Sequence, residues 1–272
     1  MKSIALGQYY PSNSVLHRTD PRIKIILAIL YIVCSFLCKN IISFGLLALS
    51  AIMLIIIARV PLKTIFGGLR PVLIILIITS LFNIFWTSGD ILLFEWKFIH
   101  IYLEGLYSAA FMVIRIVSLI IGTSVFLTYT TTPIDLTDAI EDLLSPLKKI
   151  RVPVHEFAMM MTIALRFIPT LVEETDKIMT AQKARGVDFS SGSLITRAKA
   201  LIPILIPLFV SAFNRASELA TAMECRCYHG GEGRTRMKVR HIRFVDFIPL
   251  VLVLILATAL IILNLLRIGF TI

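Results

Sequence analysis

The chain alternates between long apolar stretches and shorter polar connections, and the apolar stretches indicate its fold class. A helix of roughly 20 apolar residues crosses a hydrocarbon core about 30 Å thick. Five stretches approach this length, the third with the help of an amphipathic run over residues 62–69. They cover residues 23–38, 41–58, 71–86, 107–129 and 247–266. The pattern predicts an all-α integral membrane protein with about five transmembrane helices.

Residues 91–101 differ from these stretches because apolar and polar side chains alternate there. Alternation is typical of a strand that buries one face, so we expect a small hairpin or a strand-like lip near this point. Trp86 precedes this segment and Trp96 lies within it, and tryptophan is enriched at membrane interfaces. Acidic residues outnumber basic ones in this connection, which favours the extracellular side. The charged residues are Asp90, Glu95 and Glu104 against Lys97.

Basic residues in the other short connections predict the orientation of the chain. Lysine and arginine are concentrated in cytoplasmic loops of membrane proteins. Here they precede the first apolar stretch and separate the second from the third. We therefore expect the N-terminus in the cytoplasm and, with five spans, the C-terminus outside. The residues are Arg18, Arg22, Lys24, Arg59, Lys63 and Arg70.

The composition agrees with a membrane protein. Of 272 residues, 57% are hydrophobic and only 16% are charged, which excludes an ordinary soluble domain. The net charge of +10 is spread over several connections. That spread favours positive-inside topology and contact with anionic lipid rather than with nucleic acid. The lipid bilayer is therefore an expected partner, and nucleic acid is not.

The long charged block before the last apolar stretch predicts a division into three parts. Residues 1–131 form a membrane domain with transmembrane helices 1–4, residues 132–244 form cytoplasmic coupling helices, and residues 245–272 form the last transmembrane helix. Within the block, two long segments each combine an apolar limb, proline and an amphipathic limb. The apolar limbs over 157–168 and 201–210 leave the number of membrane-inserted helices open. Proline bends a helix, so we expect kinks at Pro169, Pro203 and Pro207.

A short pattern occurs at the end of both segments. Residues 180–186 read Thr-Ala-Gln-Lys-Ala-Arg-Gly, and residues 221–227 read Thr-Ala-Met-Glu-Cys-Arg-Cys. This alignment places Arg185 on Arg226. Arginine is a permanently charged, fork-shaped donor that suits acidic partners. Two matched arginines at the ends of similar helices therefore predict a paired receptor.

With residues 166–174 before it, the first pattern resembles the T component of energy-coupling factor transporters, and the likeness covers the whole chain. The resemblance implies a non-catalytic subunit of a bacterial or archaeal cell membrane that transmits ATP-driven motion during uptake of a vitamin or metal ion. Its partners would be two cytoplasmic ATP-binding subunits and one membrane-embedded, substrate-binding S component. It implies no cofactor, no metal and no nucleotide site in this chain. The ATPase-docking residues would be Ala184, Arg185, Gly186, Cys225, Arg226 and Cys227.

Other functions stay open at this point. A dedicated cobalt or nickel T subunit belongs to the same family, whereas a permease would bind substrate itself. An integral-membrane enzyme is disfavoured because the five histidines are scattered without ligand spacing. Arg115 lies within an apolar stretch, where an ionisable group is costly. It indicates either a substrate pathway or, more simply, a paired or snorkelling side chain.

Overall fold

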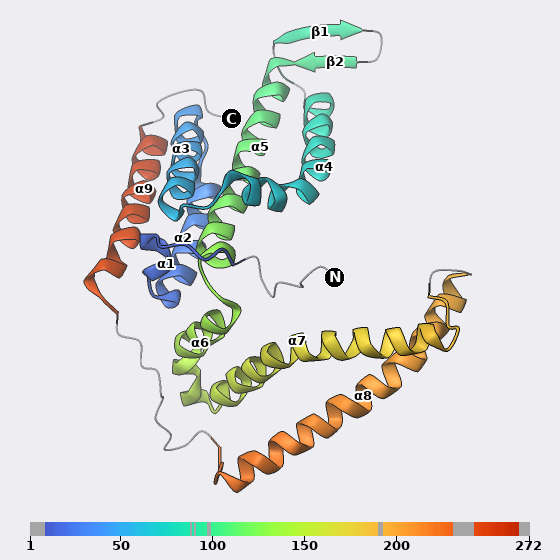
Figure 1. Ribbon diagram of the computed structural model, residues 1–272. Coiled ribbons are helices and arrows are strands. Elements are labelled where there is room, and N and C mark those ends of the chain that lie inside the picture. The colour runs from blue at the N-terminus through green and yellow to red at the C-terminus, as the bar shows by residue number, and fades with distance from the viewer. Residues whose placement is uncertain are drawn as a thin grey trace. The chain divides into compact units, whose positions relative to one another are not determined.

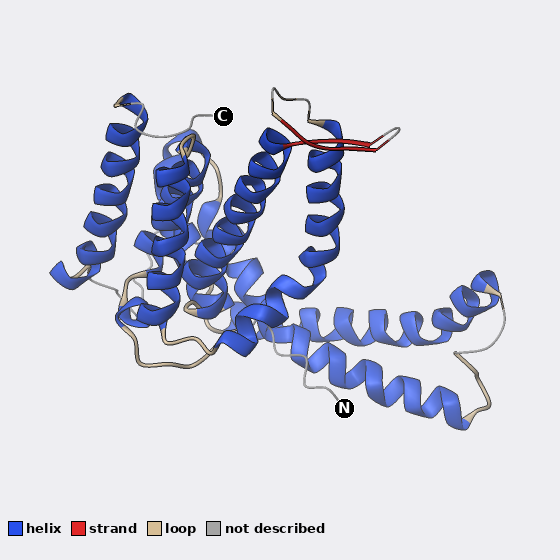
Figure 2. Ribbon diagram, turned by 90° about the horizontal axis from the view of Figure 1, so that it is seen from above, coloured by secondary structure: helices blue, strands red, loops and turns tan. Residues whose placement is uncertain are grey.

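The computed structural model describes residues 9–87, 89, 91–96, 99–189, 193–230 and 242–266. Within these residues the chain is helical apart from one two-stranded hairpin (Figure 1; Figure 2). Short helical turns η1 (Ser124–Tyr129), η2 (Ser145–Ile150) and η3 (Phe244–Asp246) join the longer elements. The helices are α1 (Val15–Arg18), α2 (Pro21–Leu37), α3 (Ile41–Ala58), α4 (Leu62–Trp86), α5 (Leu103–Thr123), α6 (Pro133–Leu144), α7 (Val154–Ala184), α8 (Leu194–Cys225) and α9 (Phe247–Leu265). The strands are β1 (Leu92–Trp96) and β2 (Ile99–Tyr102).

The described residues form two compact units. One, called here the membrane unit, contains residues up to 139 together with those from 242 onward. The other, called the helix-pair unit, contains residues from 140 to 230. The first division falls inside α6, close to the boundary expected after residue 131. That these units are the three-part functional division expected from the sequence stays a prediction.

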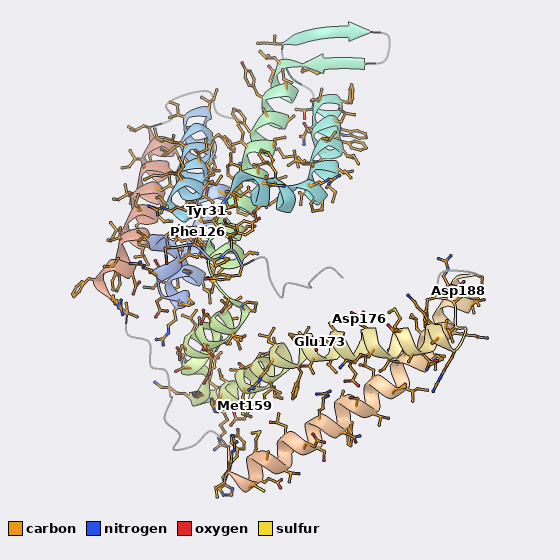
Figure 3. All side chains as sticks on the ribbon, viewed as in Figure 1. Tyr31, Phe126, Met159, Glu173, Asp176 and Asp188 are labelled. Atoms are coloured by element: carbon orange, nitrogen blue, oxygen red, sulfur yellow. The ribbon has the colours of Figure 1, made fainter. Side chains whose placement is uncertain are left out.

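The core of the membrane unit lies where α2 packs against α5, η1 and α9. Tyr31 of α2 is fully buried and meets the edge of the Phe126 ring at 6.1 Å between centroids (Figure 3). Gly122 of α5 lies directly against the Tyr31 ring, and a Cβ at this position would collide with it. A glycine is therefore required for the close approach of α5 to α2.

Polar contacts at both ends hold α2 and α9 parallel. At one end the Asp20 amide donates to Asp246 Oδ1. At the other end Asn40 donates to the Leu263 carbonyl, and Asn264 donates to the Leu37 carbonyl. Buried polar groups in an apolar bundle require such partners. These contacts therefore fix the register of the two helices along their whole length.

α3 runs antiparallel to α2, and this places the predicted cytoplasmic residues at one end of the unit. The Tyr31 and Ser50 hydroxyls are 3.2 Å apart, while Cys38 Sγ donates to the Ser43 carbonyl. The C-terminus of α3 at Arg59 consequently lies at the end where α2 begins. We call this end, with Arg18, Arg22, Arg59 and Arg243, the basic end.

Five described helical segments are long and apolar enough to cross a membrane, which agrees with the expected number. One assignment differs from the expectation, since α8 qualifies and α2 does not. α2 has 17 residues, about 25 Å of helix and one residue fewer than α3, which is at the short end of the range for a spanning helix, and Arg22 and Lys24 lie in its first turn. α8 continues as a helix through Pro203 and Pro207, so the apolar limb over 201–210 is part of one long helix. The five segments are Ile41–Ala58, Leu62–Trp86, Leu103–Tyr129, Ile195–Cys225 and Phe244–Leu265.

The expected hairpin is confirmed. β1 pairs with β2 in antiparallel register, with Glu95 opposite His100 and an irregularity between Leu92 and Phe94. It joins α4 to α5, and the Leu103 amide continues the pairing by donating to the Ile91 carbonyl. The Trp96 side chain and residues 90, 97 and 98 lie outside what the structure describes.

Candidate functional site

The two predicted motifs end the two longest helices of the helix-pair unit. α7 and α8 pack against each other in antiparallel orientation, because Glu174 contacts Arg215 and Gln182 contacts Pro203. α7 is positioned at its start by the Glu141 carboxylate of α6, which lies 3.0 Å from Nδ1 of His155. The two motifs therefore lie at opposite ends of the helix pair.

The first motif is a helix cap built from Ala184, Arg185 and Gly186. Ala184 is the last residue of α7, and the Gly186 amide donates to the Lys183 carbonyl while the Val187 amide donates to the Gln182 carbonyl. These two bonds define a Schellman cap, which needs a left-handed residue just after the helix. Gly186 supplies it with φ of +87°. The cap leaves the Arg185 side chain exposed at the helix end.

The second motif, Cys225, Arg226 and Cys227, forms the same cap. The Cys227 amide donates to the Glu224 carbonyl at 2.9 Å, and the Tyr228 amide donates to the Met223 carbonyl at 3.1 Å. Cys227 takes the left-handed position with φ of +57°, where a side chain is normally disfavoured. The replacement of small neighbours by cysteines thus changes the composition of the cap and not its backbone geometry.

The Glu174–Arg215 ion pair lies midway between the two caps. Arg215 Nη2 lies 2.9 Å from Glu174 Oε2. Glu174 precedes Arg185 by 11 residues, and Arg215 precedes Arg226 by the same number. At 1.5 Å per residue, each motif arginine lies about 16 Å from the ion pair along its own helix. Because the helices run in opposite directions, the two arginines are roughly 33 Å apart along the pair.

Gln182 connects the helices near the first cap. Its side-chain amide donates to the Pro203 carbonyl at 3.4 Å. In a regular helix that carbonyl would accept from the amide of residue 207, but Pro207 has no N–H. The contact therefore gives the Pro203 carbonyl a donor in place of the one that Pro207 lacks. No pattern in the sequence indicated this contact.

The prolines expected to act as kinks lie inside continuous helices. Pro169 is within α7, and Pro203 and Pro207 are within α8. The kinks themselves stay a prediction. The apolar side chains around these prolines are largely exposed in the chain by itself, so bilayer or protein must cover them in the cell. They include Phe157, Met160, Ile168, Leu205, Ile206, Phe209 and Phe213.

Arg115 in the membrane unit is a paired side chain. Its Nη2 donates to the Cys38 carbonyl at 2.9 Å, and its guanidinium lies 5.1 Å from the centre of the Phe44 ring. Cys38 caps the C-terminus of α2, where the helix dipole favours a cation. These contacts give Arg115 a structural role and remove the need for a substrate pathway to explain it.

The geometry defines a class: a multi-pass, all-α membrane protein with two matched arginine caps on an antiparallel helix pair. Known proteins show which family this is. The family model described as cobalt transport protein, CbiQ, matches residues 12–238. The chain belongs to this family, and its relatives identify it as the T component of an energy-coupling factor transporter.

Three relatives are named energy-coupling factor transporter transmembrane protein EcfT. The protein from Clostridium kluyveri is 53% identical over 94% of this chain and 95% of its own length. Those from Ruminiclostridium cellulolyticum and Bacillus subtilis are 54% and 50% identical, over 92% and 88% of this chain and 92% and 89% of their own lengths. These names do not favour the dedicated cobalt or nickel subunit, nor the permease that binds substrate itself.

Proposed function

We propose that the chain transmits ATP-driven motion through its two arginine caps, with Arg185 anchoring one cytoplasmic ATPase subunit and Arg226 a second. The observation that carries the proposal is the geometric match of the caps: the same backbone bonds present an exposed arginine at each end of one helix pair. Two equivalent anchors at opposite ends suit two similar partners. The chain itself then acts as a coupling subunit without a catalytic residue, a cofactor or a metal.

Arginine suits this role because of its shape and permanent charge. A guanidinium makes charge-assisted, often bidentate bonds to carboxylates. Truncating one partner of a buried charge pair at an interface costs about 2–5 kcal/mol. A helix end also lets the side chain enter a groove without a neighbouring turn in the way. The acidic groove on each ATPase is part of the proposal.

Alanine substitutions test the two anchors separately. Arg185→Ala and Arg226→Ala should each weaken copurification of the ATPase subunits, and the double variant should abolish both copurification and substrate uptake. Arg185→Lys and Arg226→Lys should retain only part of the ATPase binding, since lysine lacks the forked guanidinium. The measurement is affinity purification of the chain from membranes, followed by quantification of bound ATPase.

Lys177 and Arg197 provide matched controls because both are exposed cations of α7 and α8 outside the caps. Their alanine variants should retain ATPase binding. Full uptake by the Arg185→Ala, Arg226→Ala double variant would contradict the proposal, and so would equal losses in the Lys177→Ala and Arg197→Ala controls.

The exposed apolar side chains of α7 and α8 support the second half of the proposal, a membrane-embedded S component. Phe157 and Met160 of α7 and Phe209 and Phe213 of α8 are each more than half exposed. Large apolar side chains exposed in this way are typical of surfaces that contact protein or membrane. We propose that these faces carry the motion of the caps to the S component, which holds the micronutrient.

A further inference from the structure

The membrane unit contains an apolar cavity that the coupling role does not use. It has a volume of about 290 Å³ and lies among α1, α2, α3, η1 and α9. α3 lines it from Ile57 to Ser50, and α9 lines it from Ile248 to Leu256. At 1.5 Å per residue these walls are about 10–12 Å long. We call this elongated cavity the slot.

The slot is closed on its inner side and open on its outer side. Tyr31 and Phe126 form inner walls and are fully buried, and the Tyr31 hydroxyl is paired with Ser50. Met53 of α3 and Leu252 of α9 line the slot and are 47% and 42% exposed. The slot therefore opens sideways between α3 and α9, where a helix bundle in a membrane meets lipid.

The lining favours hydrocarbon over water. Apart from the paired hydroxyls of Tyr31 and Ser50, the lining side chains are apolar. A water molecule needs two to four polar partners, and apolar cavities stay dry. A chain about 10–12 Å long also fits within one leaflet, whose hydrocarbon is roughly 15 Å deep. The occupant that matches length and chemistry is a lipid acyl chain.

Three arginines adjoin, along the chain, the elements that line one end of the slot. Arg18 follows the lining residue Leu16 by two positions, Arg59 follows Ile57 by two, and Arg243 precedes Ile248 by five. All three arginines are exposed. Each ends or precedes an element that lines the slot, so their charges gather where a lipid headgroup would lie.

The acids at this end are already engaged by the backbone. Asp246 accepts from the amides of Asp20 and Arg243, and Asp20 accepts from the amide of Arg22. Both carboxylates are buried, and Asp20 also lies 3.9 Å from Nε of Arg22, which is not one of the three exposed arginines. Basic pockets between transmembrane helices recognise anionic lipid headgroups.

We propose that the slot binds one anionic glycerophospholipid, with an acyl chain between α3 and α9 and its phosphate among Arg18, Arg59 and Arg243. The lipid completes the packing of α9 against α3, since both helices line the slot. This site is independent of the arginine caps, so it stands whether or not Arg185 and Arg226 bind ATPases.

Native mass spectrometry of the full chain can test the headgroup contact. The chain is reconstituted in nanodiscs that contain phosphatidylcholine with a minority of phosphatidylglycerol, and the lipids retained after release are counted. One phosphatidylglycerol should remain bound per chain. The Arg18→Gln, Arg59→Gln, Arg243→Gln variant should lower its preference over phosphatidylcholine by about tenfold or more.

Lys63→Gln with Arg70→Gln is the matched control, since both residues are exposed cations of α4 that do not adjoin the slot. This control should retain the lipid. Equal retention of the two phospholipids by the unaltered chain would mean surrounding bilayer lipid only and would overturn the proposal. Retention of phosphatidylglycerol by the triple variant would overturn it as well.

Filling the slot tests the acyl chain. Met53→Trp with Leu252→Trp should expel the bound lipid regardless of its headgroup, whereas Ile52→Trp, on an exposed part of α3 outside the slot, should not. Lipid retained equally by both variants would overturn the proposal. If the filled variant does not fold, the arginine variants still decide the question.

Discussion

At the scale of single residues, the two caps are equal in backbone and unequal in strain. Gly186 adopts positive φ at little cost, because glycine has no Cβ. Cys227 adopts the same region with a side chain, which costs about 1–2 kcal/mol in a left-handed conformation. The second cap should therefore open more readily than the first. The sequence predicted both arginines, but it could not show that a cysteine would occupy the left-handed position.

Cys227→Gly should stabilise the second cap by up to about 1 kcal/mol, since the gain at positive φ is partly offset by the greater flexibility of unfolded glycine. Hydrogen exchange at the Tyr228 amide, which donates to the Met223 carbonyl, should slow by up to about fivefold. Gly186→Ala should have the opposite effect at the Val187 amide. Cys225→Ala, a change inside the helix, is the control, and slowing in it equal to that in Cys227→Gly would contradict the strain argument.

At the scale of elements, the sequence predicted α7 and α8 well and their contacts poorly. The repeated pattern over residues 180–186 and 221–227 gave the ends of both helices. Pro203 and Pro207 were expected to kink the second segment, and α8 is one continuous helix through both. Pro207 leaves the Pro203 carbonyl without its helical donor, and the Gln182 side chain of α7 donates to that carbonyl instead. Such a contact joins residues 21 positions apart, and no local pattern in the sequence encodes it.

The Glu174–Arg215 pair should make a small, measurable contribution to the helix pair. The side chains are 28% and 38% exposed, so solvent screens them and the coupling energy should be about 0.2–1 kcal/mol. A double-mutant cycle with Glu174→Gln and Arg215→Gln, followed by thermal unfolding of the purified chain, measures it. The exchanged pair Glu174→Arg with Arg215→Glu should recover part of the loss.

Glu173→Gln serves as the control for that cycle, because Glu173 is the exposed neighbour of Glu174 on α7 (Figure 3). It should show no coupling to Arg215. Raised salt should reduce the Glu174–Arg215 coupling, as expected for a partly exposed ion pair. A coupling energy of zero at low salt would show that the contact does not hold the helices together.

At the scale of the whole molecule, the sequence predicted the fold class and number of spans from apolar length alone. It assigned one span to α2, which proves short but lies at the centre of the membrane unit, packed against α5 and α9. Length and composition do not show how much of an apolar helix is buried; Tyr31 of α2 is fully buried, whereas Ile29 and Phe36 are 59% and 64% exposed. The antiparallel course of α3 then gathers Arg18, Arg22 and Arg59 at one end, as the charge pattern suggested.

Native cysteines can report the orientation of the chain. Cys225 and Cys227 are exposed in the second cap, while Cys34 and Cys38 are buried in the membrane unit. If the basic end and the coupling helices face the cytoplasm, a membrane-impermeant maleimide should label the chain in inside-out vesicles and not in right-side-out vesicles. Cells expressing the chain without ATPase subunits should be used, so that docking does not shield the second cap.

Ile91→Cys, placed in a chain whose Cys225 and Cys227 are changed to serine, gives the reverse test. Ile91 is 52% exposed and precedes the hairpin, which we expect on the outer side. This variant should react in right-side-out vesicles and stay unlabelled in inside-out vesicles. Labelling of both sites from the same side would mean that the second cap and the hairpin share one face of the membrane. The caps could not then reach cytoplasmic ATPases while the hairpin faces outward, and the expected orientation would be wrong.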